Sequence, residues 1–168
     1  SHNIASEQPG LTAELEQTRQ EVIRVLACAA EYRDQETGNH VLRVGRYSSL
    51  IARQLGFSPS RVDLIGQAAI LHDLGKIGIP DSILLKPDRL TDAEKEVMKQ
   101  HCEYGLKILQ CIPTGGRWGP NDFDHTQLSP VLRMAATISI SHHERWDGKG
   151  YPRGLRGEDI PIEGRIVA

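Results

Sequence analysis

Apolar residues recur at three- and four-residue steps along most of this chain, which is the spacing that places them on one side of an α-helix. The pattern predicts a helix over residues 11–31, a second over 41–55 that ends at Gly56, and a third that begins at Ser58-Pro59 and leads into His72-Asp73. No segment of useful length alternates apolar and polar residues with period two, as a half-buried strand would. The chain is therefore predicted to be all-α.

A fourth helix is predicted from its start signal. Thr91 and Glu94 have the spacing of a capping box, in which each side chain bonds the backbone N–H of the other residue. The helix that follows is expected to run to about Leu109 and to carry His101. The glycine- and proline-rich stretch before it, residues 75–88, is predicted to be a structured loop.

A last helix is predicted after a polar loop over residues 114–124. Ser129-Pro130 resembles an N-cap followed by proline at the first helical position. The apolar residues after it indicate a helix that leads into the tandem histidines His142-His143.

The composition limits the kinds of protein that the chain can be and the partners that it can bind. Its 168 residues suit one domain with a sizeable core, and its formal charge of −2 argues against coating a long nucleic-acid polymer. No apolar run approaches the roughly 20 residues that cross a bilayer. The chain has an odd number of cysteines without Cys-x-x-Cys spacing, which are Cys28, Cys102 and Cys111. Their number and spacing argue against a disulfide framework and for a reducing cytoplasm.

The first residues carry no targeting signal. Residues 1–10 lack the basic and apolar regions of a signal peptide. They are expected to be a disordered N-terminal segment, with Ser1-His2 as a remnant of cloning, ahead of a single domain over residues 11–168.

Histidines and acids from distant parts of the sequence form the strongest chemical signal. His72-Asp73 opens a phrase that ends on Lys76, and His142-His143 precedes a glycine-rich run over residues 147–152. His101 lies between them on a helical pattern, and the run 36–40 lies upstream. Imidazoles and carboxylates gathered from several helices are what a site for two or more divalent metals requires. Such a site activates water against a phosphate ester.

Each of these residues has a more ordinary interpretation when it is considered alone. An isolated His-Asp pair at a helix end is usually a surface pair, and a single helical histidine such as His101 or His40 is usually half-buried without a ligand role. Lys76 alone would more often be solvated. The two oxygens of Asp73, however, can bridge two metals, and Lys76 beyond Gly75 can turn back to steady a phosphate oxygen. Only as members of one set do these residues become candidate ligands.

The motifs resemble those of the HD-GYP family, a branch of the HD metal hydrolases. The resemblance runs from about Arg33 to Ala168 and is carried by residues 36–40, 72–76, 98–101 and 142–158. It implies an HD-domain helical bundle with a glycine-rich GYP loop. It also implies a metal-dependent phosphodiesterase that hydrolyses cyclic di-GMP to linear pGpG or GMP in bacterial signal transduction.

The resemblance implies a role for each matching residue. The catalytic residues would be Asp73, as the bridge between metals, and Lys76. The cofactor would be two or three divalent ions, iron or manganese, and a site this rich in imidazole independently favours Fe, Mn or Zn over Mg or Ca. The metal ligands would be Glu36 (where a third metal is bound), His40, His72, Asp73, His101, His142 and His143. The substrate-binding residues would be Lys76, Arg145, Lys149 and Tyr151.

The resemblance also implies partners. The family often carries an upstream receiver or sensor domain of a two-component system, and partner proteins are expected at the glycine-rich loop. The helix over residues 11–31 would then be the tail of a signalling connector, whereas its ordinary interpretation is the first helix of the bundle. A homodimer is compatible with the resemblance, and no nucleic-acid polymer is expected.

Two departures from the family pattern leave alternatives open. The segment 111–128 is longer than usual and is expected to form a lid or a partner surface. The sequence stops at Ala168, so the C-terminal helices of the fold, with a further aspartate ligand, are expected to be missing and the metal site incomplete. The alternatives are a catalytically inactive binding or docking module, and a hydrolase that acts on another nucleotide phosphate.

Overall fold

The computed structural model describes residues 8–34, 39–110 and 128–168, and all of the regular secondary structure in these residues is helical. The prediction of an all-α fold is therefore confirmed. The α-helices are α1 (Gln8–Tyr32), α2 (Asn39–Gln54), α3 (Pro59–Ala69), α4 (Asp81–Leu84), α5 (Asp92–Lys99), α6 (His101–Gln110), α7 (Pro130–Ser139) and α8 (Ile162–Val167). Two 3₁₀ turns complete the set, η2 (Leu74–Gly78) and η5 (Gly157–Asp159).

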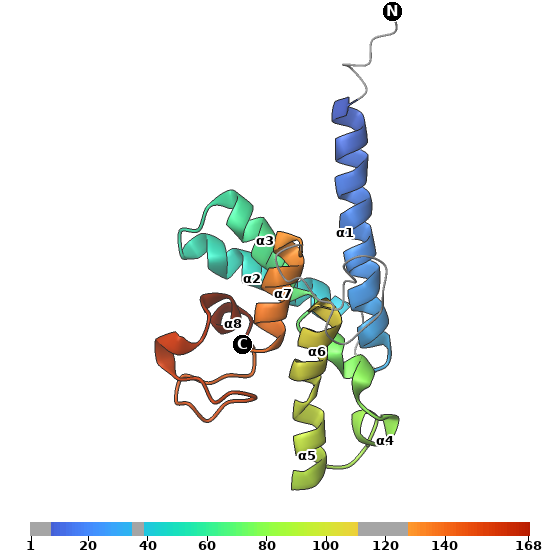
Figure 1. Cartoon of the computed structure of the whole chain (residues 1–168), viewed down its shortest axis with the longest axis vertical. Helices are drawn as coiled ribbons and strands as arrows, with labels where there is room; N and C mark the ends of the chain where they lie inside the picture. Colours follow the sequence, from blue (N-terminus) through green and yellow to red (C-terminus); the bar gives the residue numbers. More distant parts are fainter. Residues whose placement is uncertain (1–7, 35–38, 111–127) are drawn as a thin grey trace, which may run out of the picture.

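The helices surround one main core, with α1 standing along its edge (Figure 1). α2 packs on α3, and α7 packs on both α3 and α6, while η2 lies against α6 and the C-terminal end of α1. The N-terminal half of α1 extends beyond the other helices. The core is built from small and branched aliphatic side chains, in keeping with a chain that has few aromatics: Ile23, Ala27, Val41, Ala68, Leu71, Leu109, Val131 and Ile138.

The predicted helix starts are confirmed by their capping bonds. The Ser58 and Ser129 hydroxyls accept from the N–H groups of Arg61 and Leu132, each with proline in the first helical turn. Thr91 and Glu94 form the reciprocal capping box.

Two details of the predicted helices were wrong, namely the end of the third helix and the continuity of the fourth. Both lie beside candidate site residues. The third helix ends at Ala69, and tight i→i−3 turns such as His72 N–H to Ala69 O at 3.2 Å carry the chain through His72-Asp73. The helix expected from Thr91 to Leu109 is two helices, α5 and α6, divided at Gln100. There the backbone N–H bonds the carbonyl of Val97, three residues back, and no glycine or proline marks the change.

The stretch 75–88 is more regular than the predicted loop, because it contains most of η2 and the single turn α4. α1 begins at Gln8, three residues before the predicted start. No helix in the described ranges is long and apolar enough to span a bilayer. Cys28 and Cys102 are free thiols. The predictions for residues 1–7, Glu36, Cys111 and the segment 111–127 lie outside the described residues.

Candidate metal centre

The candidate ligands lie at the ends of three helices that meet in the middle of the bundle. His72 and Asp73 follow α3, His101 is the first residue of α6, and His142 and His143 follow α7. These ends can meet because η2 and α6 approach closely at Gly75. A Cβ atom added to Gly75 would lie 1.8 Å from the His101 carbonyl oxygen, so only glycine fits this contact.

Asp73 stands between His101 and His142 on one side and His72 with Lys76 on the other. Its Oδ1 lies 3.3 Å from both His101 Nε2 and His142 Nε2. Its Oδ2 lies 3.2 Å from His72 Nε2 and 3.0 Å from Lys76 Nζ. One carboxylate is therefore shared by both halves of the cluster, which is the arrangement of a bridging ligand.

Backbone carbonyls set the orientation of three of the rings. His72 Nδ1 lies 2.9 Å from the Ala69 oxygen and His101 Nδ1 lies 2.8 Å from the Met98 oxygen. His142 Nδ1 lies 3.1 Å from the oxygens of Ile138 and Ser139. Since a carbonyl can only accept, each Nδ1 carries the proton and donates. When such a ring is neutral, its Nε2 lone pair faces Asp73, and metal-bound histidines commonly donate their other ring N–H to a carbonyl in this way.

The cluster fits a divalent metal by its donor atoms and by its unsatisfied oxygen. Donor atoms of Asp73, His101, His142 and His143 all lie within 4.8 Å of one another. Asp73 Oδ1 is buried and has no hydrogen-bond partner. A buried carboxylate oxygen beside imidazole nitrogens is satisfied either by protons on those nitrogens or by a cation between them. Nitrogen and carboxylate donors together suit Fe, Mn or Zn.

Asp73 is held as an anion by the rings around it. Burial raises the pKa of the Asp73 carboxyl, but hydrogen bonds from the rings of His101, His142 and His72 outweigh burial and hold the pKa well below the ordinary value. These bonds need a proton on each Nε2, the position that a bound cation would take over. Burial lowers the pKa of His142, and burial together with the neighbouring His142 and His101 lowers the pKa of His143 to about 3. His72 differs, because Asp73 outweighs its burial and raises its pKa.

His40 lies at the edge of the cluster. Its ring centroid is 6.1 Å from that of His72, and His72 is in turn 5.2 Å from His142. His40 comes from the first turn of α2, directly after the residues that the structure does not describe. The structure thus places His40 beside the His72 half of the cluster, but it does not test a ligand role for it.

Lys76 is held at the cluster by two carboxylates. Its ammonium bonds Asp73 and also Asp34, the residue just past α1. Burial alone would lower the pKa of Lys76, but the charge of Asp73 and the bond to Asp34 outweigh it and raise the pKa, so the ammonium stays charged. The Asp34 contact was not predicted, because no sequence spacing links residue 34 to residue 76.

The glycine-rich loop reaches the cluster through Tyr151. The Tyr151 ring stacks on His143 with centroids 4.6 Å apart, and Lys99 Nζ lies 5.4 Å from the centroid of the same ring. The loop is anchored by Glu144, a buried carboxylate that accepts from Arg153 N–H at 2.7 Å and Leu155 N–H at 2.8 Å. Glu144 and Lys99 were not predicted. Glu144 follows the tandem histidines directly, and that position was its only sequence signal.

Two of the predicted substrate residues lie on the exposed side of the same loop. Arg145 pairs with Asp147 at 2.9 Å, and Lys149 is exposed, with its backbone N–H bonded to the same aspartate. The structure therefore does not bring Arg145 and Lys149 into the imidazole cluster, whereas it does bring Lys76 and Tyr151 there.

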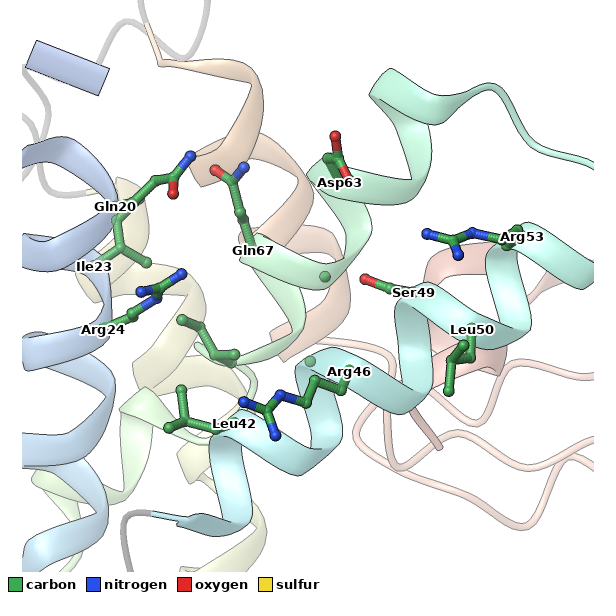
Figure 2. Close-up of a pocket in the computed structure, with 13 residues that line it drawn as sticks. Gln20, Ile23, Arg24, Leu42, Arg46, Ser49, Leu50, Arg53, Asp63 and Gln67 are labelled. Carbon is green, nitrogen blue, oxygen red and sulfur yellow. The ribbon is translucent and has the colours of Figure 1, made fainter. Parts of the chain in front are cut away.

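A separate groove lies between α1, α2 and α3 and contains none of the cluster residues (Figure 2). Arg24, Arg46 and Arg53 line it together with the apolar residues Ile23 and Ile70. Asp63 is the only carboxylate among its lining residues, and no histidine or cysteine lines it, so the groove offers no cluster of metal ligands.

The fold and the cluster together define a helical domain with an imidazole-rich cluster at its helix ends that could hold a metal ion. A family model described as an HD domain matches residues 4–168. The chain belongs to the HD domain family, and its motifs and relatives place it in the HD-GYP branch.

Curated relatives carry phosphodiesterase names. A cyclic di-GMP phosphodiesterase of Thermotoga maritima is 49% identical over 88% of this chain and 36% of its own length. The response regulator RpfG of Xanthomonas campestris, also a cyclic di-GMP phosphodiesterase, is 45% identical over 92% of this chain and 37% of its own length. A 3′3′-cGAMP-specific phosphodiesterase of Vibrio cholerae is 41% identical over 98% of this chain and 29% of its own length. The chain spans about a third of the length of these relatives.

Proposed function

We propose that this chain is the catalytic domain of a metal-dependent phosphodiesterase that hydrolyses cyclic di-GMP to linear pGpG or GMP. The observation that carries the proposal is the position of Asp73, since its Oδ1 faces His101 and His142 while its Oδ2 faces His72 and Lys76. The phosphodiesterase names of the relatives support the same chemistry.

The cluster residues would divide between two metal ions. His101 and His142 would share one ion with Asp73 Oδ1, and His72 would hold the other with Asp73 Oδ2. His143 would join the first group and His40 the second, because of where their rings lie. Glu36 would add a third ion in the family's pattern. We propose iron or manganese for the bound ions, which would supply a water of lowered pKa and charge stabilisation at phosphorus.

Lys76 would act on the phosphate itself. In hydrolysis the oxygen of water bonds to phosphorus, the bond from phosphorus to the 3′ oxygen breaks, and that oxygen gains a proton. Negative charge grows on the phosphoryl and leaving oxygens during this change, and a fixed ammonium stabilises it. Lys76 is charged and held in place by Asp34 and Asp73, so it meets both conditions.

Tyr151 would form the wall on which a guanine base or ribose rests. Its ring is half-buried, stacks on His143 and lies near Lys99. Arg145 and Lys149, on the exposed side of the loop, would meet the second phosphate of a cyclic dinucleotide. One relative is named as specific for 3′3′-cGAMP. The second candidate substrate is therefore a cyclic dinucleotide with a purine other than guanine at one position.

We further propose the partners and setting that the family pattern implies. These are an upstream receiver or sensor domain joined through α1, partner proteins at the glycine-rich loop, a homodimer, and a cytoplasmic location. The free thiols of Cys28 and Cys102 support a reducing compartment.

The proposal is tested by incubating the manganese- or iron-loaded protein with cyclic di-GMP, 3′3′-cGAMP and a non-cyclic phosphodiester, with products separated by ion-exchange chromatography. We expect pGpG or GMP from cyclic di-GMP, and loss of turnover in Lys76→Met with metal content retained. Turnover of only the non-cyclic ester would contradict the substrate. Binding of cyclic di-GMP without turnover, in protein that carries metal, would instead support the docking-module alternative.

A further inference from the structure

The groove between α1, α2 and α3 holds three arginines that the proposed catalytic function does not use. Arg24 comes from α1, while Arg46 and Arg53 lie on one face of α2. None of the three has an ion pair or a hydrogen bond with another described residue. α2 itself contains no acidic residue, so the charge of these guanidinium groups is not balanced within the helix.

The groove has the size and shape of a site for a small molecule. Its volume is about 780 Å³, and small-molecule pockets occupy roughly 300–1,000 Å³. Figure 2 shows the side chains of Arg24 and Arg46 directed into the space between α1 and α2 from opposite sides. Guanidinium groups that converge from two helices fit a small anion, whereas contact with a membrane surface would need them on a protruding face.

The rest of the lining suits an organic ligand better than bare phosphate. Two buried apolar residues line the groove beside the arginines, namely Ile23 and Ile70. Three polar side chains also line it, namely Gln20, Ser49 and Gln67. A flat ring with polar edges would contact both kinds of side chain, while its phosphate groups would contact the arginines. Arginine binds phosphate through two parallel hydrogen bonds, which makes it well suited to this role.

We propose that this groove binds a nucleotide that carries two or more phosphate groups. Seven residues of helix separate Arg46 from Arg53, a rise of about 10 Å, so the two can contact different phosphate groups of one ligand. Arg24 would join Arg46 at one end of the phosphate chain. Asp63, the only carboxylate among the lining residues, would reduce the affinity by its like charge. This inference does not rest on the proposed catalytic function.

The groove is separate from the candidate metal centre but shares two helices with it. None of its lining residues belongs to the imidazole cluster. Ile70 nevertheless lies two residues before His72, and α2 carries His40 in its first turn. Nucleotide binding in the groove should therefore not require bound metal, although the bound nucleotide would contact the helices that carry the candidate ligands.

The proposal is tested by isothermal titration calorimetry of the manganese-loaded protein with ATP, GTP and inorganic pyrophosphate. We expect about one equivalent of ATP or GTP to bind, more tightly than pyrophosphate. Arg24→Gln with Arg46→Gln should raise the nucleotide Kd by about 100-fold or more, because charged hydrogen bonds to phosphate are lost. The control Arg43→Gln with Arg89→Gln removes the same charge from exposed positions outside the groove and should stay within about threefold of the wild type.

Two further variants separate the groove from the metal centre. Asp73→Ala should retain nucleotide binding, and Asp63→Asn should tighten it several-fold because a like charge is removed. All four arginines are exposed, so circular dichroism and metal content should match the wild type in both double variants.

Three outcomes would overturn the proposal. Nucleotide binding that is lost in Asp73→Ala but unchanged in Arg24→Gln with Arg46→Gln would place the nucleotide on the metal ions. Equal affinity for pyrophosphate would show that phosphate alone is recognised. A wild-type chain that binds no nucleotide, whether or not it binds vesicles of anionic phosphatidylglycerol, would leave the groove without the proposed ligand.

Discussion

Asp34 accepts a hydrogen bond from the Lys76 ammonium, and this contact joins the end of α1 to the candidate metal centre. Lys76 also bonds Asp73 at 3.0 Å, so a chain of three charged groups runs from α1 to the shared carboxylate. The side chains of Asp34 and Lys76 are mostly buried, with 16% and 17% of their surfaces exposed. The contact with Asp34 therefore holds the Lys76 ammonium in place beside Asp73.

Replacement of Asp34 should lower turnover without removing metal. In Asp34→Ala the Lys76 ammonium loses one of its two anchors, and we expect kcat to fall by about 10- to 100-fold, the range for partners that orient functional groups. Asp34→Asn keeps an oxygen acceptor and should lose less. Metal content, measured in the same samples, should match the wild type. A loss of metal equal to the loss of activity would show that Asp34 supports the ligands and not Lys76.

Replacement of Glu144 should release the glycine-rich loop. Glu144→Ala leaves the N–H groups of Arg153 and Leu155 without their acceptor, which should cost about 1–3 kcal/mol in the free energy of unfolding. Urea denaturation measures this cost. The control Glu158→Ala removes an exposed carboxylate from the same region and should change stability little. If both variants unfold alike, Glu144 does not anchor the loop.

Addition of a methyl group at Gly75 should separate η2 from α6. Since the new Cβ would lie within 2.3 Å of the Gly105 nitrogen and closer still to the His101 oxygen, Gly75→Ala should destabilise the fold by about 1–3 kcal/mol or more. It should also weaken metal binding, because His101 moves away from Asp73. Gly10→Ala is the control: no atom lies within 4 Å of its new Cβ, and alanine should favour α1 by about 1 kcal/mol. The free energies of unfolding of both variants would be measured by thermal or urea unfolding.

The capping box at the start of α5 should make stability depend on acid pH. The bond from Lys86 and those from Thr91 lower the pKa of Glu94 from 4.5 to about 2. A lowered folded-state pKa means that the contribution of Glu94 is present above pH 4.5 and is lost as the pH falls toward 2. The stability difference between wild type and Glu94→Gln should therefore be largest near neutral pH and vanish in acid. A difference that stays constant with pH would contradict the assignment.

The sequence predicted the fold well where side-chain spacing acts locally. Helical periodicity, the serine caps at residues 58 and 129 and the capping box at Thr91 all produced the expected helix starts. It failed at the break at Gln100. At that break the His101 ring bonds the Met98 carbonyl and also faces Asp73 from another part of the chain, and local spacing does not record contacts of this kind.

The candidate site was predictable only for the residues that belong to short sequence motifs. His72, Asp73, His101, His142 and His143 were selected as a set and lie together in the structure, although their roles as ligands remain predictions. Asp34 and Glu144 were missed because their importance lies in long-range contacts, with Lys76 and with the loop at residues 153–155. No periodicity or motif spacing records a contact of that kind.

If Asp73 bridges two metal ions, as proposed, the metal stoichiometry of the protein depends on it. The protein would be loaded anaerobically with Fe²⁺ or with Mn²⁺, desalted, and analysed by inductively coupled plasma mass spectrometry together with protein concentration. We predict about two equivalents for the wild type and for Asp63→Ala, which removes an exposed carboxylate from the α1–α3 groove, and less than one for Asp73→Ala. A wild type without bound metal, or an Asp73→Ala variant with the wild-type content, would contradict the claim.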